Sequence, residues 1–418
     1  MKTKAVRLYG ENDLRMEEFE LPDIKPDEIL VEVISDSVCM STYKAAILGK
    51  KHKRVPQDVD RNPIIIGHEF SGNIIKVGTE WRDKFREGSK FALQPALNYK
   101  GTMWSPGYSY KYFGGNATYN IIPREVMEIG CLLDYQGESY YEASLAEPMS
   151  CIIGAFHANY HTEMGNYVHK MGIVSGGRLA LLAAAGPMGL GAVDYALHCD
   201  RKPGLLVVTD IDEDRLERAR SIFTEEEAEK CGVKLFFVNT SDVADVPGYL
   251  KSLTGGVGYD DVFVFAPAKS VFEQGDRILA RDGCLNFFAG PTDTGISAEL
   301  NLYNIHYSST HVMGTTGGNT DDLIESLKLT EKGLINPAVM VTHIGGLNAV
   351  SDTVLNLPKI PGGKKLIYNQ IEMKLTAISD FEKEAASNPK FAKLAEIISK
   401  NNGLWCPEAE KYLLDNWK

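Results

Sequence analysis

Hydrophobic residues in the first 125 positions fall into short runs separated by glycine and proline. The run Ile29–Ser35 roughly alternates between apolar and polar residues, and Phe70–Gly78 is interrupted by glycines that indicate bulges or tight bends. Ile64–Ile66 is short and fully apolar, as expected for a buried strand. Many short strands with glycine and proline between them predict a β-barrel-like domain.

From Arg178 onward, apolar strands alternate with segments long enough for helices. This pattern predicts an α/β domain with a doubly wound parallel sheet. Its predicted strands are Leu179–Ala184, Leu205–Thr209, Leu235–Val238, Asp261–Phe265, Cys284–Phe288 and His311–Gly314.

The segments on either side of this sheet set the expected domain boundaries. The segment from Ala146 predicts an amphipathic helix with Pro148 in its first turn. After Gly314 the pattern is mixed, and the charged residues after Met373 are helix-prone without an assigned role. We therefore expect a first catalytic part at 1–160, a nucleotide-binding domain at 161–314, and a return to the catalytic domain plus a helical extension at 315–418.

Composition narrows the class of protein. A chain of 418 residues is long enough for two domains, and its net charge of -12 argues against a nucleic-acid binder. The sequence contains no run of 18 apolar residues, so no membrane span is predicted. The N-terminal residues lack the apolar region of a signal peptide. Seven scattered cysteines without a C-x-x-C pair suit reduced thiols. We expect a cytoplasmic enzyme.

The first strand of the α/β segment leads into a glycine-rich turn that matches most of the G-x-G-x-x-G fingerprint. Ala184 replaces the first glycine, while Gly186 and Gly189 fill the second and third positions, with Pro187 and Met188 between them. The second glycine lets the backbone approach a pyrophosphate, and the third allows close packing of helix on strand. The turn predicts dinucleotide binding; the alternative is a structural turn in an unrelated α/β protein.

Asp210 ends the second predicted strand, where an acidic residue would bind the adenosine ribose. A carboxylate there favours NAD(H) over NADP(H), because it would repel the additional phosphate. Arg215 lies close to Asp210 in the sequence, so use of NADP(H) as well stays open.

Four side chains have the chemistry of a zinc site. Cys39 and the adjacent pair His68 and Glu69 each follow a predicted strand, and Glu147 lies at the predicted helix start. A thiolate, an imidazole and carboxylates, with one position left for water or substrate, are typical of catalytic zinc. Such a metal would polarise a carbonyl oxygen for hydride transfer from a nicotinamide. The alternative is a His-Glu pair on the surface.

Two further groups of residues have less specific signals. The basic run Lys50–Arg54 includes Lys51, Lys53 and Arg54, which are suitable partners for a phosphate dianion; the alternative is a solvated loop. His157 and His161 are four positions apart on a predicted helix, and without a glutamate in the metalloprotease position we interpret them as surface residues of that helix.

Taken together, these motifs resemble the zinc-dependent medium-chain dehydrogenase/reductase family, the alcohol and polyol dehydrogenases, over about residues 1–370. The resemblance implies a GroES-like β-barrel catalytic domain, split in sequence around a Rossmann domain, and often a homodimer or homotetramer. It implies that Cys39, His68 and either Glu147 or Glu69 bind the catalytic zinc, and that Ser41 starts a proton relay. The motifs that carry it are Cys39, Gly67–Glu69, the Gly-Gly-x-Ala-x-Tyr segment at 114–119, Glu147–Pro148, the turn at 184–189, and Asp210.

The chain departs from this family in three places. The region Gln94–Gly115 lacks the four cysteines that hold a structural zinc in many members, so we expect a single zinc. The family's relay often continues to a histidine, but that position is Lys44, next to Tyr43, and the exit path of the proton stays open. The interval between Cys39 and His68 is also longer than usual and contains the basic run.

Within the family, the chain resembles the L-sorbose 1-phosphate reductases. This similarity implies reduction of L-sorbose 1-phosphate to D-glucitol 6-phosphate with NAD(P)H. A dehydrogenase of another polyol, polyol phosphate or amino alcohol stays open, as does a catalytically silent nucleotide-binding relative. The stretches that carry the similarity are 98–101, 106–110, 156–161 and 317–322.

Overall fold

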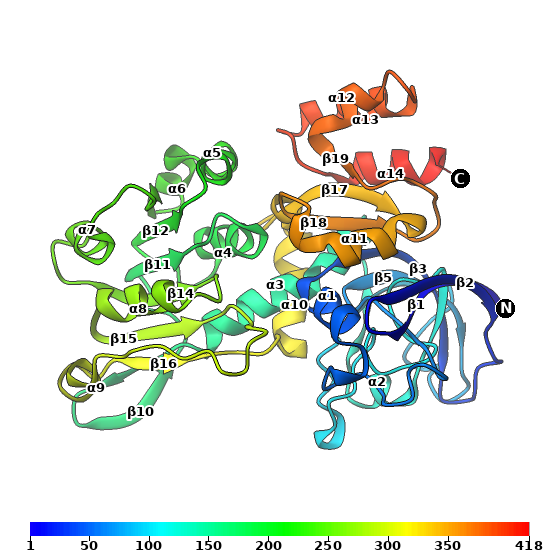
Figure 1. Ribbon diagram of the computed structural model, residues 1–418, viewed down its shortest axis with the longest axis horizontal. Coiled ribbons are helices and arrows are strands. Elements are labelled where there is room, and N and C mark those ends of the chain that lie inside the picture. The colour runs from blue at the N-terminus through cyan, green and yellow to red at the C-terminus, as the bar shows by residue number, and fades with distance from the viewer. Residues whose placement is uncertain (418) are drawn as a thin grey trace. The chain divides into compact units, whose positions relative to one another are not determined.

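The computed structural model describes residues 1–417, and the chain forms two compact units (Figure 1). The first unit contains Met1–Pro148 and the chain from Val341 onward, and the second contains Met149–Met340. We call them the catalytic unit and the coenzyme unit. The unit boundaries differ from the predicted domain ends at residues 160 and 314, because residues up to Met340 pack with the coenzyme unit. One contact of this kind is the Asn336 N–H, which donates to Asp194 at 2.6 Å.

The coenzyme unit is built on a six-stranded sheet in which all neighbouring strands are parallel. The strand order is β13-β12-β11-β14-β15-β16, which is the doubly wound order of dinucleotide-binding domains. Buried Ala180, Val207 and Val262 pack in its core. The strands are β11 Arg178–Leu182, β12 Leu205–Asp210, β13 Lys234–Asn239, β14 Tyr259–Val264, β15 Leu279–Phe287 and β16 His311–Met313. The predicted parallel sheet is confirmed, with ends shifted by a few residues.

Helices connect these strands, and a separate hairpin precedes them. The helices are α4 Pro187–His198, α5 Glu213–Ile222, α6 Glu225–Lys230, α7 Val246–Ser252, α8 Lys269–Ile278, α9 Leu302–Ser308 and α10 Thr320–Glu331. The hairpin is formed by β9 Tyr160–Glu163 and β10 Asn166–Met171, and the 3-10 helix η3 Pro337–Met340 ends the unit.

The catalytic unit contains an eight-stranded sheet and a three-stranded sheet. Strands from both ends of the chain meet in the larger sheet, where β18 pairs antiparallel with β3 and Lys365 lies opposite Val38. This pairing brings the C-terminal part of the chain beside the end of β3, one residue before Cys39. The larger sheet contains β19 Thr376–Ala377, β17 Val341–Gly346, β18 Lys364–Tyr368, β3 Ile29–Val38, β5 Phe70–Val77, β6 Lys90–Leu93 and β8 Leu132–Tyr135, with β7 Tyr119–Ile122 paired to β3; the smaller contains β2 Asp13–Glu20, β1 Lys2–Gly10 and β4 Ile64–Ile65.

Helices of the catalytic unit are mostly short. They are α1 Met40–Leu48, α2 Arg124–Glu128, α11 Val350–Asn356, α12 Phe381–Glu384, α13 Lys390–Lys400 and α14 Pro407–Asn416, with 3-10 helices at Gly49–Lys51, Tyr99–Gly101, Leu347–Ala349, Leu357–Lys359 and Ile378–Asp380. The helix-prone extension after Met373 is confirmed as α12, α13 and α14. Within residues 1–417, no helix is long and apolar enough to cross a membrane.

Helix α3 (Tyr140–Ala158) corrects two predictions. It begins at Tyr140 and not at Ala146, so Pro148 lies inside the helix. It also ends before His161, which lies on β9. The helical spacing of His157 and His161 therefore does not apply, because the chain leaves the helix at Asn159, whose side chain donates to Asp261 at 2.7 Å.

Candidate metal centre

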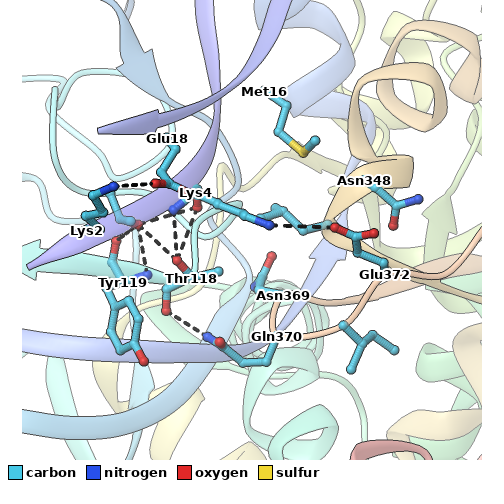
Figure 2. Close-up of a pocket in the computed structure, with 13 residues that line it drawn as sticks. Lys2, Lys4, Met16, Glu18, Thr118, Tyr119, Asn348, Asn369, Gln370 and Glu372 are labelled. Atoms are coloured by element: carbon cyan, nitrogen blue, oxygen red, sulfur yellow. Dashed lines mark hydrogen bonds and ion pairs between the residues drawn. The ribbon is translucent and has the colours of Figure 1, made fainter. Parts of the chain in front are cut away.

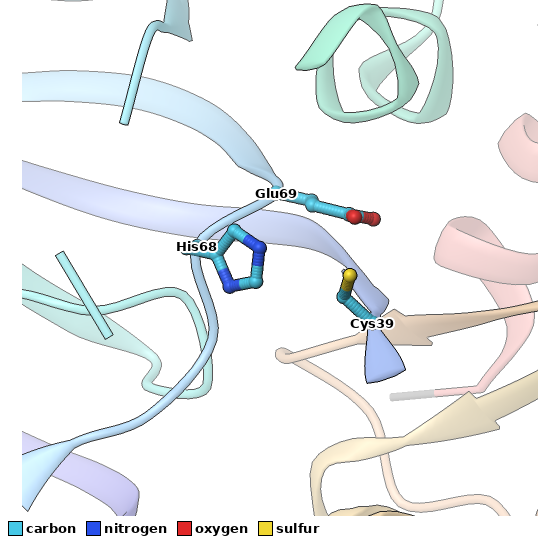
Figure 3. Close-up of side chains that lie close together, drawn as sticks. All are labelled: Cys39, His68 and Glu69. Carbon is cyan, nitrogen blue, oxygen red and sulfur yellow. The ribbon is translucent and has the colours of Figure 1, made fainter. Parts of the chain in front are cut away.

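Cys39, His68 and Glu69 come together at the ends of strands, as predicted (Figure 3). Cys39 follows β3, and the pair His68 and Glu69 lies directly before β5. Gly67 precedes the pair with φ of +90°, a conformation that a side chain would strain. One ligand atom from each of the three residues lies within 4.8 Å of the other two; among the described residues, this is the group of side chains that could hold a metal ion.

Glu69 is held by a buried lysine that the sequence analysis missed. The Lys364 ammonium, at the start of β18, lies 2.5 Å from both carboxylate oxygens of Glu69, and the Ser37 hydroxyl also donates to Glu69. Burial by itself would raise the pKa of Glu69, but the Lys364 ammonium and His68 hold it below its usual value. Burial by itself would lower the pKa of Lys364, but the negative charges of Glu69 and Cys39 outweigh the effect of burial and raise this pKa. Glu69 is therefore an anion with a fixed partner.

Glu147 lies near this group but is not part of it. Its side chain is buried, and burial together with the charge of Glu69 raises its pKa to about 7. Burial also raises the pKa of Cys39, again with Glu69 as the next cause.

The donor set fits zinc. Thiol, imidazole and carboxylate are ligands that zinc prefers. The ammonium of Lys364 compensates one of the negative charges that Cys39, Glu69 and Glu147 would carry, and a divalent cation would compensate the others. The ligand roles of Cys39, His68, Glu69 and Glu147 stay predictions, as does the expectation of a single zinc.

The predicted relay residues have different surroundings. Ser41 Oγ donates to Cys39 Sγ at 3.0 Å and lies 3.3 Å from His68 Nε2. Tyr43 packs against the hydrophobic core. Lys44 is partly buried, and this burial lowers its pKa, while the charge of Cys39 opposes the shift. Ser41 is thus the predicted relay residue that directly contacts the metal-ligating side chains.

Tyr108 is a second residue of the site that sequence reasoning missed. It is buried, and its ring centroid lies 5.1 Å from that of His68. Burial raises its pKa well above the ordinary tyrosine value, and the charge of Cys39 adds to this. The only signal in the sequence was its place in the stretch 106–110, which gave no role.

The three predicted phosphate-binding residues have different surroundings. Arg54 lies over the ring of Tyr108, with its guanidinium carbon 5.4 Å from the ring centroid, and its buried Nε has no partner among the described residues. Lys51 pairs with Glu11 at 2.8 Å, and Lys53 is exposed. Of these three residues, Arg54 is therefore the one beside Tyr108, whose ring contacts His68.

The glycine-rich turn has the geometry that its fingerprint predicts. A Cβ on Gly189 would lie 1.9 Å from the carbonyl oxygen of Ala184, so helix α4 packs directly on the end of β11. A Cβ on Gly186 would meet no described atom within 4 Å, which leaves the backbone open to a ligand. Pro187 and Met188 form the first turn of α4. The turn therefore suits a pyrophosphate at a helix N-terminus.

Asp210 lies at the end of β12, beside this turn. Its carboxylate accepts hydrogen bonds from the backbone N–H groups of Ala185 at 3.0 Å and Ile211 at 2.9 Å. Arg215 pairs with Asp212 at 3.3 Å on helix α5. The coenzyme-binding roles of Asp210 and Arg215 stay predictions.

His157 and His161 have structural partners. His157 Nδ1 lies 2.9 Å from Asp322, and His161 Nε2 lies 3.1 Å from Asp261. Neither residue belongs to the group of metal-ligating side chains found in the described chain. Within residues 1–417, no cysteine forms a disulfide.

A cavity of about 310 Å³ lies elsewhere in the catalytic unit (Figure 2). Its two lysines each pair with a glutamate, Lys2 with Glu18 at 3.0 Å and Lys4 with Glu372 at 3.6 Å. No residue predicted for catalysis, metal or coenzyme lines it. This cavity is therefore separate from the metal centre.

The fold and this site define a zinc-dependent alcohol or polyol dehydrogenase. The family described as "Alcohol dehydrogenase GroES-like domain" matches residues 25–129, and the family "Zinc-binding dehydrogenase" matches residues 187–332. The chain belongs to the zinc-dependent medium-chain dehydrogenase/reductase family, and it is an oxidoreductase.

Two similar proteins act on phosphorylated sugars or polyols. Mannitol-1-phosphate 5-dehydrogenase of Aliivibrio fischeri is 55% identical over 99% of this chain and 98% of that protein. L-sorbose 1-phosphate reductase of Klebsiella pneumoniae is 45% identical over 99% of this chain and 97% of that protein. A structure from Sinorhizobium meliloti 1021, described as a zinc-binding dehydrogenase bound to NADP, is 19% identical with a TM-score of 0.71, and covers 88% of this chain and 100% of that one.

Proposed function

We propose that this chain interconverts a phosphorylated ketose and the corresponding polyol phosphate, using one zinc ion and NAD(H) or NADP(H). L-sorbose 1-phosphate and D-glucitol 6-phosphate are the first substrate pair. The names of the two similar proteins support the phosphorylated class. The observation that carries the proposal is the position of Arg54, a cation beside Tyr108 and hence one aromatic ring away from His68.

The residues of the centre have separate roles in this proposal. Cys39 and His68, together with Glu69 or Glu147, would hold the metal. When bound, zinc would supply a Lewis acid for the carbonyl oxygen, and the nicotinamide would supply the hydride. Arg54 would bind the substrate phosphate, because a guanidinium matches a phosphate with two parallel hydrogen bonds.

Ser41 would transfer the proton between the substrate oxygen and solvent. Its hydroxyl donates to Cys39 Sγ at 3.0 Å, and its interaction with Tyr108 opposes the rise in the pKa of that phenol. This arrangement supports a relay that continues through the phenol of Tyr108. Tyr43 packs in the core and is less suited to that step.

Arg54→Gln tests the substrate class, with Lys53→Gln as the matched control in the exposed part of the same run. A hydrogen bond to a charged group contributes about 1.5 to 3 kcal/mol, so kcat/KM for L-sorbose 1-phosphate should fall roughly 10- to 100-fold in Arg54→Gln. The rate with unphosphorylated D-sorbitol should stay nearly unchanged in both variants. Equal losses on both substrates in Arg54→Gln would contradict the phosphate role.

Oxidation of mannitol 1-phosphate is the second candidate, because the Aliivibrio fischeri protein is named for it. The two reactions differ in where the phosphate lies. In L-sorbose 1-phosphate the phosphate-bearing carbon is next to the carbonyl carbon, whereas oxidation of mannitol 1-phosphate at C5 takes place several carbons away. Rates with both compounds, each measured with NADH or NAD and with NADPH or NADP, decide between them and also give the coenzyme preference.

We also propose assembly into a homodimer or homotetramer through the coenzyme unit. Exposed apolar side chains gather on β10 and α9, where Tyr167 is 94% and Leu302 is 73% exposed. Strand β16 forms one edge of the sheet of this unit. Mass measurement in solution tests the proposal, and a monomer at micromolar concentration would contradict it.

A further inference from the structure

The C-terminal segment that follows β18 packs within the catalytic unit (Figure 1, red). Its strand β19 pairs with β17, and its helix α14 buries Ala409 and Leu413 completely. The segment lies beyond residue 332, where the family matches end. Sequence analysis gave it no role.

Glu410 on α14 is a buried carboxylate with three hydrogen-bond donors. Its side chain is 3% exposed. Its Oε2 accepts the Tyr140 N–H at 2.7 Å, and its Oε1 accepts the Tyr141 N–H at 2.8 Å and the Tyr368 hydroxyl at 2.9 Å. The first two donors are the first two backbone N–H groups of helix α3.

Helix α3 therefore receives its N-terminal cap from a residue 270 positions away. The hydroxyl of Ser139, which would cap the helix locally, is buried without a hydrogen-bond partner among the described residues. The first N–H groups of a helix have no partner within it, and a carboxylate at that end is favoured by the helix dipole. Glu410 takes the place of the local cap.

The part of α3 that Glu410 caps is the part that carries Glu147. Pro148 follows Glu147 within the helix. Proline has no N–H and clashes with the carbonyl group one turn before it, so it weakens the coupling between the helix on its two sides. The first two turns, Tyr140–Glu147, therefore depend on their own anchors. Besides Glu410, these anchors include the contacts of Ser144 with Ser35 and of the Tyr140 carbonyl with Ser71.

The third donor lies on the strand that carries the partner of Glu69. Tyr368 ends strand β18, and the same strand begins with Lys364, which binds Glu69. The Trp405 indole N–H donates to the Tyr368 hydroxyl at 2.8 Å, so this connection also belongs to the C-terminal segment. One carboxylate thus contacts both α3, which carries Glu147, and β18, which carries the lysine that binds Glu69.

We propose that Glu410 is a positioning residue for the metal centre: through the start of α3 and the end of β18, it sets where Glu147 and Lys364 lie. The C-terminal segment is thereby a structural part of the zinc site. This inference rests on the family's zinc site but not on the identity of the substrate, so its failure would leave the proposed reaction untouched.

The test uses zinc affinity and the spectrum of the cobalt-substituted protein. Glu410→Gln keeps the size of the side chain but removes its charge and one acceptor oxygen. We expect its zinc affinity, measured by competition with a chelator, to fall roughly 10- to 100-fold, as for other residues that orient metal ligands. We also expect shifted visible absorption bands of bound cobalt.

Two control variants separate positioning from general destabilisation. Glu408→Gln changes an exposed residue of the same helix, and Leu394→Ala destabilises the segment from the buried face of α13. Both should keep the wild-type zinc affinity and cobalt spectrum. Wild-type affinity and spectrum in Glu410→Gln, whatever its melting temperature, would overturn the proposal.

A second measurement needs no variant. Coupling between two sites is reciprocal, so zinc should stabilise the contacts of Glu410 as much as Glu410 favours zinc. Addition of zinc to the metal-free wild-type protein should slow amide hydrogen exchange in residues 140–147 and 407–413. Protection confined to the segments around Cys39 and His68 would overturn the proposal even where Glu410→Gln does not fold.

Discussion

The nucleotide turn and the metal centre are built in opposite ways. The turn consists of six consecutive residues, Ala184–Gly189, and its backbone packs so closely that a Cβ on Gly189 would clash with the Ala184 carbonyl oxygen. The candidate metal centre brings together Cys39, directly after β3, and His68 and Glu69, directly before β5, and its charge balance depends on the buried Lys364 of β18. The turn thus depends on the backbone geometry of one short segment, whereas the centre depends on charge interactions between residues that are distant in sequence. Substitutions should separate the two.

The largest effect is expected for Cys39→Ser. A serine hydroxyl is a poor zinc ligand, so we expect loss of bound zinc and a fall in kcat of about 1000-fold or more. Metal analysis and steady-state kinetics measure both, and circular dichroism should show the fold preserved. Coenzyme binding to the turn should survive. Normal activity after exhaustive chelation of the wild-type protein would contradict a catalytic zinc.

Lys364→Met tests the charge balance of the centre. Removing one member of a buried ion pair leaves the other charge uncompensated and typically costs about 3 to 5 kcal/mol. We expect a loss of this order in the free energy of unfolding of the metal-free protein, measured with denaturant. The double variant Lys364→Met with Glu69→Gln should recover part of it. A single variant as stable as the wild type would show that Glu69 does not need its partner.

Two glycine substitutions test the turn. Gly189→Ala places a Cβ 1.9 Å from the Ala184 carbonyl oxygen and should lower the free energy of unfolding by about 1 to 3 kcal/mol. Gly186→Ala meets no described atom within 4 Å, so it should leave stability unchanged and raise the KM for the coenzyme. Zinc content should stay normal in both. A stable Gly189→Ala with unchanged KM would contradict the fingerprint geometry.

The smallest effect is a pH dependence that originates in the capping carboxylate. Burial raises the pKa of Glu410 to about 7, although the N–H groups of Tyr140 and Tyr141 and the Tyr368 hydroxyl oppose the shift and Glu142 adds to it. The folded protein therefore binds this proton more tightly than the unfolded chain. The stability that the proton contributes is complete below the unfolded pKa of about 4.5 and is lost as the pH rises through about 7.

This dependence is measured against Glu410→Gln, which does not titrate at that position. Between pH 5 and 7.5, the free energy of unfolding of the wild type should fall relative to Glu410→Gln by about 1 to 2 kcal/mol. Denaturant titrations at several pH values give the difference. Parallel pH profiles for the two proteins would show that Glu410 has an ordinary pKa.

The amino-acid sequence by itself determined the local features of this protein. Hydrophobic spacing located every strand of the parallel sheet, and the turn at 184–189 was predictable because its six residues are contiguous and its glycines have a steric reason. Cys39, His68 and Glu69 were predictable because strand ends in one sheet bring nearby residues together. The start of α3 was not predictable, since its cap is supplied by Glu410.

Only the tertiary structure decided the surroundings of those residues. Lys364 contacts Glu69 because β18 pairs with β3. The conformation of the loop places Arg54, and neither Lys51 nor Lys53, over the ring of Tyr108. Charge interactions inside a protein depend on distance and burial, which a linear order does not contain. The residue types therefore predicted a metal centre. The long-range pairing of β18 with β3 determined that Lys364 balances the charge of Glu69.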